Sequence, residues 1–376
     1  MSTHNSASLK ALKGLADAPS PVTVETLRAF VAEQPELAGQ DFRVLFNSEA
    51  LAAGASGGTT LFEIAGEQPS DFRGSFVLRY ELGGGGIFSQ TSLAAQFELM
   101  RALGERGIAV PEAVWLDEEG KIAGGQPALI MRRVFAHAPS IQYLQNGFFA
   151  SSNDARREQM MRNLFAIAVA LHAIPVDSVN LPILDARGGK EKHFLDREID
   201  WVLAELHAKF PDQEEGERAE LHRSMRQTLE EAASVMRDYA PRDRSPVIAH
   251  GDLTIANTMF RDDCSIAALL DWELTHYGLP GMDVAYFLAA MISIAEFGTQ
   301  IIPMPTEEDT IRFYVEAGGT LEDFAYCRAF AAFRVSTWGA IGMRRMPREF
   351  WPAQRRMWEI HNGLLTEAIS SLKSST

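Results

Sequence analysis

The sequence predicts an α+β protein with a small antiparallel-sheet lobe and a larger, mostly helical lobe. From about Phe42 to Val134, short strand-like runs alternate with turn-rich pieces, and one helical pattern interrupts them. After Ala136, long amphipathic patterns dominate, and only residues 247–273 break them with a strand-loop-strand pattern. The expected parts are an N-terminal helical extension at 1–40, the sheet lobe at 41–135 with a strand-like hinge near 131–134, and the helical lobe at 136–376.

The individual elements follow from the spacing of apolar residues. Strands are expected at FRVLF, TTLFEIA, SFVLRYEL and PALIMRRV, which are rich in β-branched and aromatic residues. From Ser92 to Arg106, apolar residues recur three and four positions apart, which predicts a helix with Ser92 as its N-cap and Gly107 as its stop. In the second lobe, helices are expected near 157–173, 196–209, 217–239, 281–298, 321–341 and 350–372.

The composition limits the classes of protein that fit. The chain has 376 residues, of which 46% are hydrophobic and 23% charged, so it can form two lobes with a buried core. Two cysteines are too few for a disulfide framework or a cysteine-based zinc site. The formal net charge of -15 disfavours non-specific attraction to nucleic acid or to an anionic membrane.

We expect neither a secretory signal peptide nor a membrane span. The opening MSTHNSASLK lacks the apolar core of a signal peptide. The longest apolar run, Val284–Ala295, is shorter than the roughly 18 residues that suggest a membrane span. We therefore expect a cytoplasmic protein that binds neither nucleic acid nor a membrane.

The stretch VIAHGDLTIANTMFRDDCSIAALLDWELTHYGLPGMDVAYF, residues 247–287, holds three polar side chains at a suggestive spacing. Asp252 ends a His-Gly-Asp triplet, Asn257 lies five residues later, and Asp271 fourteen residues further on. Phosphoryl transfer needs a carboxylate near the attacking hydroxyl and hard oxygen ligands for magnesium, and these residues supply both. Alone, an Asp-x-x-x-x-Asn pair favours an ordinary polar turn, because both residue types are common in turns. The HGD before the pair and the IAALLDWE after it reverse that preference.

The motifs HGDLTIAN, LLDWE and GMDVAYF resemble the signature of the aminoglycoside phosphotransferase and choline kinase superfamily, which are small-molecule kinases with a bilobal protein-kinase-like fold. The resemblance covers about residues 42–340. It implies ATP and Mg²⁺ as cofactors and transfer of the γ-phosphate to a hydroxyl of a small-molecule acceptor.

Position by position, the resemblance assigns roles within the HGD to DWE span. Asp252 takes the place of the catalytic base, and His250 braces its loop. Asn257 and Asp271 take the places of metal ligands. Glu273 is either a further metal-side carboxylate or a structural partner.

The same resemblance assigns the nucleotide to the sheet lobe. The segment GASGGTT, residues 54–60, is expected to form the turn of a hairpin whose backbone amides at Ser56, Gly57 and Gly58 cover the ATP phosphates. A plain flexible hairpin fits the segment almost as well. The run GGGG at 83–86 is interpreted as a loop, because it lacks the Lys-Ser/Thr of a P-loop and the acidic residue that follows a Rossmann turn.

Arg79 stands where the family often has a phosphate-binding lysine. Arginine keeps its charge and offers a forked donor, although a solvated strand arginine is the alternative. The partner glutamate of the family falls on Gln96 in this chain, and Glu98 could serve only after a small shift in register. Arginine in place of lysine at residue 79 and glutamine in place of glutamate at residue 96 bear on the rate of turnover and the affinity for nucleotide more than on the fold.

The linker PALIMRRVF resembles the hinge that binds adenine, with Met131 guarding the pocket and Arg132 and Val134 offering backbone contacts. The alternative interpretation, a buried connecting strand without a role in binding, predicts the same sequence pattern. His172 is interpreted as a packing or C-cap residue, and Asp283 as the residue that caps or anchors the turn after DWE.

The class of acceptor is suggested by residues 341–360, IGMRRMPREFWPAQRRMWEI. This segment contains five arginines and only two glutamates, with two tryptophans between them. Such a mixture suits an anionic ligand with a flat or apolar portion, and a surface helix is the alternative. SFVLRYEL, VPEAVWLD and LLDWELTHYG look most like the kinase-like domain fused to some acyl-CoA dehydrogenases, which are thought to phosphorylate hydroxyacyl-CoA compounds. The expected acceptor is therefore anionic or acyl-type, with Arg344, Arg345 and Trp351 as candidate contacts.

Two other classes of function compete with the kinase. A kinase-shaped module that binds a nucleotide or ligand with weak or no catalysis is suggested by Arg79 and Gln96, whereas the intact Asp252, Asn257 and Asp271 favour the enzyme. A Rossmann oxidoreductase is disfavoured, because strands and helices do not alternate around the glycine run.

Overall fold

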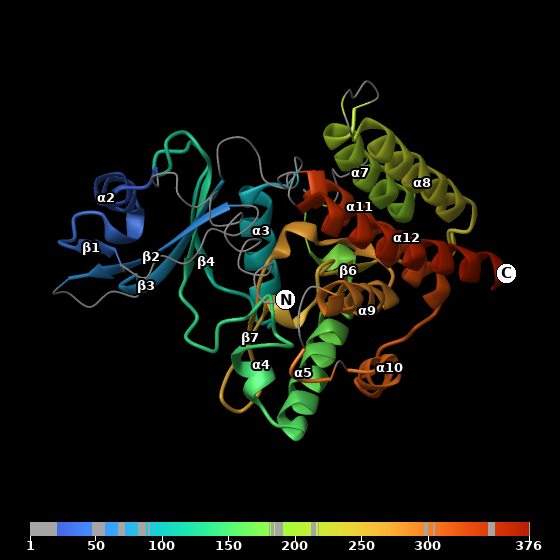
Figure 1. Cartoon of the computed structure of the whole chain (residues 1–376). Coiled ribbons are helices and arrows are strands. Elements are labelled where there is room, and N and C mark those ends of the chain that lie inside the picture. The colour runs from blue at the N-terminus through green and yellow to red at the C-terminus, as the bar shows by residue number, and fades with distance from the viewer. Residues whose placement is uncertain are drawn as a thin grey trace. The chain divides into compact units, whose positions relative to one another are not determined.

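The computed structural model describes residues 21–46, 57–66, 72–81, 88, 91–179, 181, 184, 191–211, 216, 218–296, 300–303, 305–344 and 350–375 of the chain. The chain divides into two compact units, Met1–Phe135 and Ala136–Thr376 (Figure 1). The first unit contains a five-stranded sheet and the second is mostly helical, so the predicted α+β class is confirmed.

The sheet of the first unit is antiparallel, with the strand order β1-β2-β3-β5-β4. Its strands are β1 (Arg43–Phe46), β2 (Gly57–Ala65), β3 (Gly74–Glu81), β4 (Ala113–Asp117) and β5 (Ala128–Arg132). Four of them were expected from the sequence. β4, with the sequence AVWLD, was not among the expected strands.

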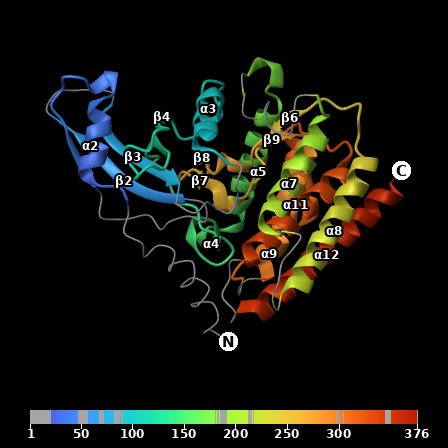
Figure 2. The ribbon, with the colours of Figure 1, turned by 90° about the horizontal axis from the view of Figure 1, so that it is seen from above.

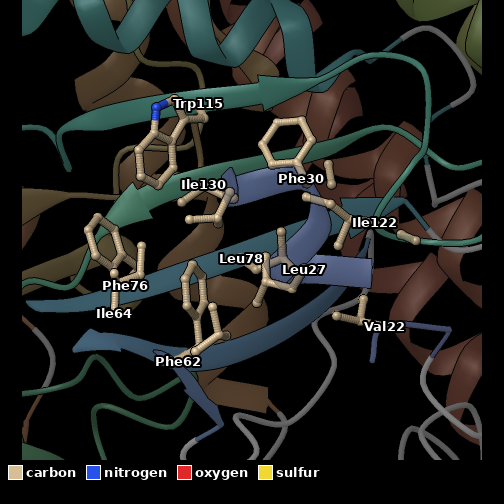
Figure 3. Close-up of a cluster of buried hydrophobic side chains, with 14 of the residues drawn as sticks. Val22, Leu27, Phe30, Phe62, Ile64, Phe76, Leu78, Trp115, Ile122 and Ile130 are labelled. Carbon is tan, nitrogen blue, oxygen red and sulfur yellow. The ribbon is translucent and has the colours of Figure 1, made fainter. Parts of the chain in front are cut away.

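Helix α2 (Val24–Ala32) and the 3₁₀ turn η1 (Pro35–Leu37) precede the sheet. α2 buries Leu27, Phe30 and Val31 in a hydrophobic cluster with the sheet. Figure 3 shows this cluster, in which Phe76 stacks on Phe62 at 5.4 Å and on Trp115 at 5.7 Å between ring centroids. The aromatic rings thus join two neighbouring strands, β2 and β3, to β4 across the sheet.

Helix α3 (Leu93–Gly104) packs against β4 and β5. Its N-cap is Ser92, whose side chain accepts a hydrogen bond from the Ala95 backbone at 3.4 Å. Gly107 follows the helix with a left-handed φ of 81°, a conformation that glycine adopts without strain. The predicted start and stop of this helix are therefore confirmed.

The second unit contains all six helices that the sequence predicted: α5 (Asp154–His172), α7 (Phe194–Lys209), α8 (Ala219–Asp238), α9 (Gly281–Glu296), α11 (Phe324–Arg344) and α12 (Trp351–Ser374). Helices α4 (Gly147–Ser151) and α10 (Glu307–Glu316) and the 3₁₀ turn η2 (Val176–Ser178) add to them. In Figure 2, α7, α8, α11 and α12 lie side by side. Within the described residues, no helix combines the length and the hydrophobicity of a membrane span.

Two short antiparallel ladders interrupt these helices. β6 (Val247–Ala249) pairs with β9 (His276–Gly278), and β7 (Thr258–Phe260) pairs with β8 (Ile266–Leu269). The 3₁₀ turns η3 (Ile255–Asn257) and η4 (Trp272–Leu274) lie between the ladders. The predicted strand-loop-strand insertion is therefore nested: the β7–β8 hairpin sits inside the β6–β9 pair, and each turn joins one ladder to the other.

The acid stability of the second unit is expected to depend on His361, which is buried in α12 beside Gly339 of α11. Burial lowers the pKa of His361 to about 4. Because the unfolded chain binds this proton near pH 6.5, stability is complete above that pH and is lost progressively as the pH falls towards 4. The shift corresponds to a loss of about 3 kcal/mol.

The measurement is urea denaturation of the unmodified protein and of His361→Leu at pH 7.5 and pH 4.5. The leucine variant should lose less free energy of unfolding between the two pH values than the unmodified protein. Ser370→Leu is the control, because Ser370 is an exposed residue of the same helix and carries no ionisable side chain. Equal pH dependence in all three proteins would contradict the role of His361.

Candidate active site

The loop that follows β6 is built around Asp283. This carboxylate lies in the first turn of α9 and is fully buried. Its Oδ2 accepts a hydrogen bond from the His250 backbone N–H, and its Oδ1 accepts one from the Gly251 backbone N–H, each at 2.8 Å. The sequence predicted an anchor for the turn after DWE, but the hydrogen bonds of Asp283 go to the HGD loop.

His172, at the end of α5, completes this network. Its Nε2 lies 3.0 Å from Asp283 Oδ2, and its Nδ1 lies 2.9 Å from the Tyr314 hydroxyl on α10. Burial alone would raise the pKa of Asp283, but the hydrogen bond and the attraction of His172, together with the Gly251 backbone hydrogen bond, hold that pKa well below its usual range. His172 was predicted only to pack or cap a helix, because its partner is more than a hundred residues away in the sequence.

Gly251 is required by a close approach between the two loops of the site. It has a left-handed φ of 83°, and a Cβ at this position would lie 2.1 Å from the Leu274 carbonyl oxygen. Any side chain would therefore separate the HGD loop from η4.

His250 connects the HGD loop to the segment that carries Asp271. Its Nδ1 accepts a hydrogen bond from the Asp252 backbone N–H at 3.2 Å, and its Nε2 lies 3.0 Å from the Leu270 carbonyl oxygen. This pattern assigns the proton to Nε2, which donates to Leu270. Burial lowers the pKa of His250, so the ring is neutral near pH 7 and serves as a brace between two backbone segments.

Asp252 is held by two neighbouring side chains. Asn257 Nδ2 donates to Asp252 Oδ2 at 2.7 Å and to the Asp252 carbonyl oxygen at 2.9 Å. The Tyr286 hydroxyl also donates a hydrogen bond to the carboxylate. Burial and the charge of Asp271 raise the pKa of Asp252 to about 7, although the two hydrogen bonds oppose the shift.

Asp271 follows β8 in the left-handed conformation, with φ at 63°. This conformation is costly for a residue other than glycine, and it turns the chain sharply into η4. Trp272 fixes that turn, because its Nε1 donates to the Leu269 carbonyl oxygen at 3.0 Å. Glu273 lies partly buried within η4.

The electrostatics of Asp252 and Asp271 suit a divalent cation. Their mutual repulsion raises the pKa of Asp252, and a bound cation would remove that repulsion. The Asp271 carboxylate and the Asn257 amide oxygen are hard oxygen donors, which fits Mg²⁺. Across the described residues, no group of three or more acidic, histidine or cysteine side chains could hold a metal by itself. The remaining ligands of the ion would have to come from phosphate and water.

Arg334 of α11 is a site residue that the sequence did not reveal. It is 1% exposed, donates to the Leu274 carbonyl oxygen at 3.2 Å and contacts His276. Its guanidinium lies 5.7 Å from the ring centroid of Tyr286, and its charge lowers the pKa of Asp252. A single arginine in the otherwise apolar run AFAAFRVSTWGA was the available signal.

The predicted hairpin turn at residues 54–60 does not extend over Gly57 and Gly58, whose contact with the ATP phosphates stays a prediction. Gly57 and Gly58 lie in β2, where they pair with Glu81 and Tyr80 of β3. The reason for glycine is contact with Tyr80: a Cβ at Gly57 would lie 2.7 Å from its carbonyl oxygen, and one at Gly58 would lie 2.1 Å from its ring. Ser56 lies outside the described residues.

The partner of Arg79 is Gln96 rather than Glu98. Arg79 Nη1 donates to Gln96 Oε1 at 3.4 Å, and Gln96 is buried on α3, whereas Glu98 is exposed. The Gln96 amide oxygen accepts this hydrogen bond but carries no countercharge for the guanidinium.

The residues of the predicted hinge, Met131, Arg132 and Val134, differ in their burial and in the hydrogen bonds of their backbone. Met131 is buried in β5, and the Arg132 backbone N–H donates to the Glu112 carbonyl oxygen at 2.9 Å. This N–H is therefore already used within the first unit. Val134 lies beyond the end of β5 and is partly buried.

The predicted acceptor residues lie against α7 and α8. Arg344 ends α11 with its guanidinium 5.3 Å from the ring centroid of Phe210. Trp351 begins α12 and lies 4.8 Å below the guanidinium of Arg218. Arg345 lies outside the described residues. Both described side chains thus take part in packing between helices.

The sequence of this chain is similar to those of a known enzyme family and of two curated proteins. A family model described as "Phosphotransferase enzyme family" matches residues 49–314. Acyl-CoA dehydrogenase family member 10 of Mus musculus is 24% identical over 272 residues, which are 69% of this chain and 23% of that protein. Acyl-CoA dehydrogenase family member 11 of Rattus norvegicus is 22% identical over 325 residues, or 83% of this chain and 38% of that protein. The chain thus spans well under half the length of these relatives.

Solved structures with a similar fold include three kinases or proteins assigned as kinases. A Ralstonia eutropha JMP134 protein assigned to the aminoglycoside phosphotransferases has a TM-score of 0.64 at 18% identity, covering 94% of this chain and 99% of that one. Plasmodium vivax ethanolamine kinase gives 0.56 at 12% identity, with coverages of 90% and 85%. The amicoumacin kinase hAmiN, solved with AMP-PNP and Ca²⁺, gives 0.55 at 11% identity, with coverages of 91% and 94%. At these identities the matches establish the fold, and the predicted kinase-like fold is confirmed.

Stability is expected to depend strongly on Asp283. Asp283→Asn replaces one of the two acceptor oxygens by an N–H₂ group that faces a donor, so the free energy of unfolding should fall by about 3 to 5 kcal/mol at pH 7. Because the folded pKa is depressed, the contribution of the carboxylate is present above about pH 4 and is lost as the pH falls below that value.

Asp309→Asn is the matched control, since Asp309 also lies in the first turn of a helix but is exposed. Urea denaturation at pH 7 should show a change of no more than about 1 kcal/mol for this variant. If the two asparagine variants unfold at the same urea concentration, Asp283 does not organise the loop.

Proposed function

This chain belongs to the phosphotransferase enzyme family, and from that premise we propose that it is a Mg²⁺-dependent kinase that transfers the γ-phosphate of ATP to a hydroxyl of a small molecule. The observation that carries the proposal is the Asp252 carboxylate, which Asn257 and Tyr286 hold beside Asp271. A fixed carboxylate next to a repelling carboxylate is what a base beside a metal site requires.

Asp252 is the proposed catalytic base. Its carboxylate accepts the proton of the acceptor hydroxyl while the hydroxyl oxygen forms a bond to the γ-phosphorus. The bond from the γ-phosphorus to the bridging oxygen breaks, and ADP leaves with that electron pair. The Asn257 and Tyr286 hydrogen bonds orient the carboxylate, which limits the rearrangement needed for the reaction.

Asn257 and Asp271 are the proposed metal ligands, with Glu273 as a further carboxylate on the same side. When bound, Mg²⁺ neutralises charge on the ATP phosphates. Asn257 can contribute its Oδ1, because its Nδ2 is occupied by Asp252. Asp271 is brought to its position by the left-handed turn after β8.

Arg79 is the proposed phosphate contact in the first unit, with Gln96 as the residue that orients it. Met131 and Val134 are the proposed contacts of the adenine ring. The Arg132 backbone N–H is excluded from this role by its bond to Glu112.

The proposed acceptor is a hydroxylated small molecule of anionic or acyl type. Two relatives are named acyl-CoA dehydrogenase family members, which supports an acyl group, although this chain covers only 23% and 38% of their lengths. Arg344 and Trp351 are the proposed contacts for an anionic part. Gln96 favours a second candidate, a nucleotide-binding module with weak or no catalysis, because the residue of α3 that meets Arg79 is an amide rather than a carboxylate.

Substitution of Asp252 separates these two candidates. Asp252→Asn should retain folding and Mg²⁺-dependent ATP binding and lower kcat by about 10²- to 10⁴-fold, which is the usual contribution of a general base. Asp271→Ala should instead weaken ATP binding in the presence of Mg²⁺. Calorimetric titration of ATP with and without Mg²⁺, together with a coupled assay for ADP, measures both effects. Turnover by Asp252→Asn close to that of the unmodified protein would rule out Asp252 as the base.

The role of Arg79 can be compared with that of Arg73, which directly precedes the same strand, β3. Arg79→Ala should raise the KM for ATP by about 10- to 100-fold, because a charged hydrogen bond to phosphate is lost. Arg73→Ala is the control, since the Arg73 guanidinium donates at 3.0 Å to the carbonyl oxygen of Asp41, which lies two residues before β1. If both variants have a similar KM for ATP, Arg79 does not contact the phosphates and serves only as a structural residue of the strand.

A further inference from the structure

A cavity of about 220 Å³ lies between α9 and α12, which are neighbours in the second unit (Figure 1). Pro305, just before α10, completes its wall together with the ion pair between Glu307 of α10 and Arg328 of α11. No described residue proposed above for the kinase reaction lines this cavity. It is therefore a second candidate site, separate from the one around Asp252.

The cavity exists because small side chains lie on the two helix faces that border it. Each helix contributes residues at positions i, i+3, i+4 and i+7, which share one face of a helix. These residues are Ala285, Leu288, Ala289 and Ile292 on α9, and Leu364, Glu367, Ala368 and Ser371 on α12. The three alanines are buried. An alanine leaves space that a leucine would fill, so the apolar groups around the cavity lack packing partners on one side.

The cavity is mainly apolar and can be reached from solvent. Met291 and Pro305 add to its apolar lining. Ile292 is 37% exposed, and Leu288 and Leu364 are half-buried, so the opening lies at these side chains. An apolar cavity of roughly 150 Å³ is large enough to hold benzene. The cavity between α9 and α12 therefore has space for an alkyl group of about six to eight carbons.

The charge at the cavity is that of one carboxylate. Among the charged lining residues, Glu307 and Arg328 neutralise each other in their ion pair. Glu367 is exposed and makes no hydrogen bond or ion pair with any described residue. The positions three and four residues away from it on α12 hold glycine, leucine and two serines, none of which is charged. A single carboxylate at the opening of an apolar cavity complements a ligand with one positive charge.

We infer that the cavity between α9 and α12 binds a primary alkylamine. The ammonium group lies beside Glu367, and the alkyl group of about six to eight carbons packs on Ala285, Ala289 and Ala368. A carboxylate of the same length would be repelled by Glu367, and an alcohol would leave Glu367 without a countercharge. This inference goes beyond the proposed kinase function and does not rest on it, because the cavity contains none of the residues assigned to the reaction.

The first test compares ligands that share an alkyl chain and differ in charge. Hexylammonium, hexan-1-ol and hexanoate are titrated at pH 7 into the unmodified protein, and ligand-detected NMR measures each Kd. Hexylammonium should bind most tightly and hexanoate most weakly, because of the charge of Glu367. The inference is overturned if hexan-1-ol or hexanoate binds as tightly as hexylammonium, or if hexylammonium does not bind.

The second test removes the charge of Glu367. Glu367→Gln should bind hexylammonium about 2- to 5-fold more weakly, as expected for the loss of one exposed ion pair, and should bind hexan-1-ol with unchanged affinity. Glu359→Gln is the matched control, because Glu359 is an exposed residue of the same helix that does not line the cavity. Equal affinities of the two glutamine variants for hexylammonium would show that the ammonium does not lie beside Glu367.

The third test fills the cavity from either wall. Ala289→Leu and Ala368→Leu should each bind hexylammonium at least about 10-fold more weakly, because the added methyl and methylene groups occupy the space of the ligand. Ala290→Leu is the matched control, since Ala290 is a half-buried residue of α9 that does not line the cavity. If both cavity variants keep the affinity of the control, the amine binds elsewhere and the inference is wrong.

The position of the ligand can also be measured in the unmodified protein, so the result does not depend on the folding of any variant. In methyl-labelled protein, the NMR signals of Leu288, Ile292 and Leu364 should shift on titration with hexylammonium. The signals of Leu229, which is buried in α8, should not. Shifts confined to methyl groups outside the cavity would overturn the inference. The titration needs neither ATP nor Mg²⁺, so its outcome is independent of the kinase proposal.

Discussion

The geometry of the candidate active site depends on one buried carboxylate. Asp283 accepts hydrogen bonds from two successive backbone N–H groups of the HGD loop and from the His172 ring, and His172 in turn meets Tyr314. Backbone N–H groups that are buried without acceptors destabilise a fold, so the loop conformation and the carboxylate require each other. Through this one residue the loop is fixed to α5, α9 and α10.

The fold also brings two negatively charged side chains, Asp252 and Asp271, close enough to repel each other. The nested β6–β9 and β7–β8 ladders deliver Asp252 and Asp271 to one place, and Gly251 allows the two loops to approach. The repulsion between the carboxylates is opposed by Arg334, which lies buried under η4 and near Tyr286. Polar groups that are fixed before a ligand arrives need little rearrangement during a reaction, and this is how proteins stabilise developing charge.

The sequence predicted the parts of this site that are encoded by short spacing. The HGD, Asn257 and DWE motifs lie within 24 residues, and the amphipathic helices repeat over a few turns, so both could be read locally. Arg334 and His172 could not, because their roles arise from partners that lie 60 and 111 residues away. Gly57 and Gly58 were misread as a turn, since their small size serves the packing of Tyr80 on the neighbouring strand.

The turn from Pro139 to Asn146 contrasts with the loop around Asp283. It is ordered by hydrogen bonds among its own residues and by one backbone bond to Ile301, so none of its exposed side chains supports the helical core. Substitutions at Ile141 can therefore accumulate at little cost to folding, whereas the HGD loop tolerates almost none. Sequence change in a protein built in this way would collect in the turn and leave the HGD loop unchanged, and a library of variants confined to the turn would retain a high proportion of folded protein.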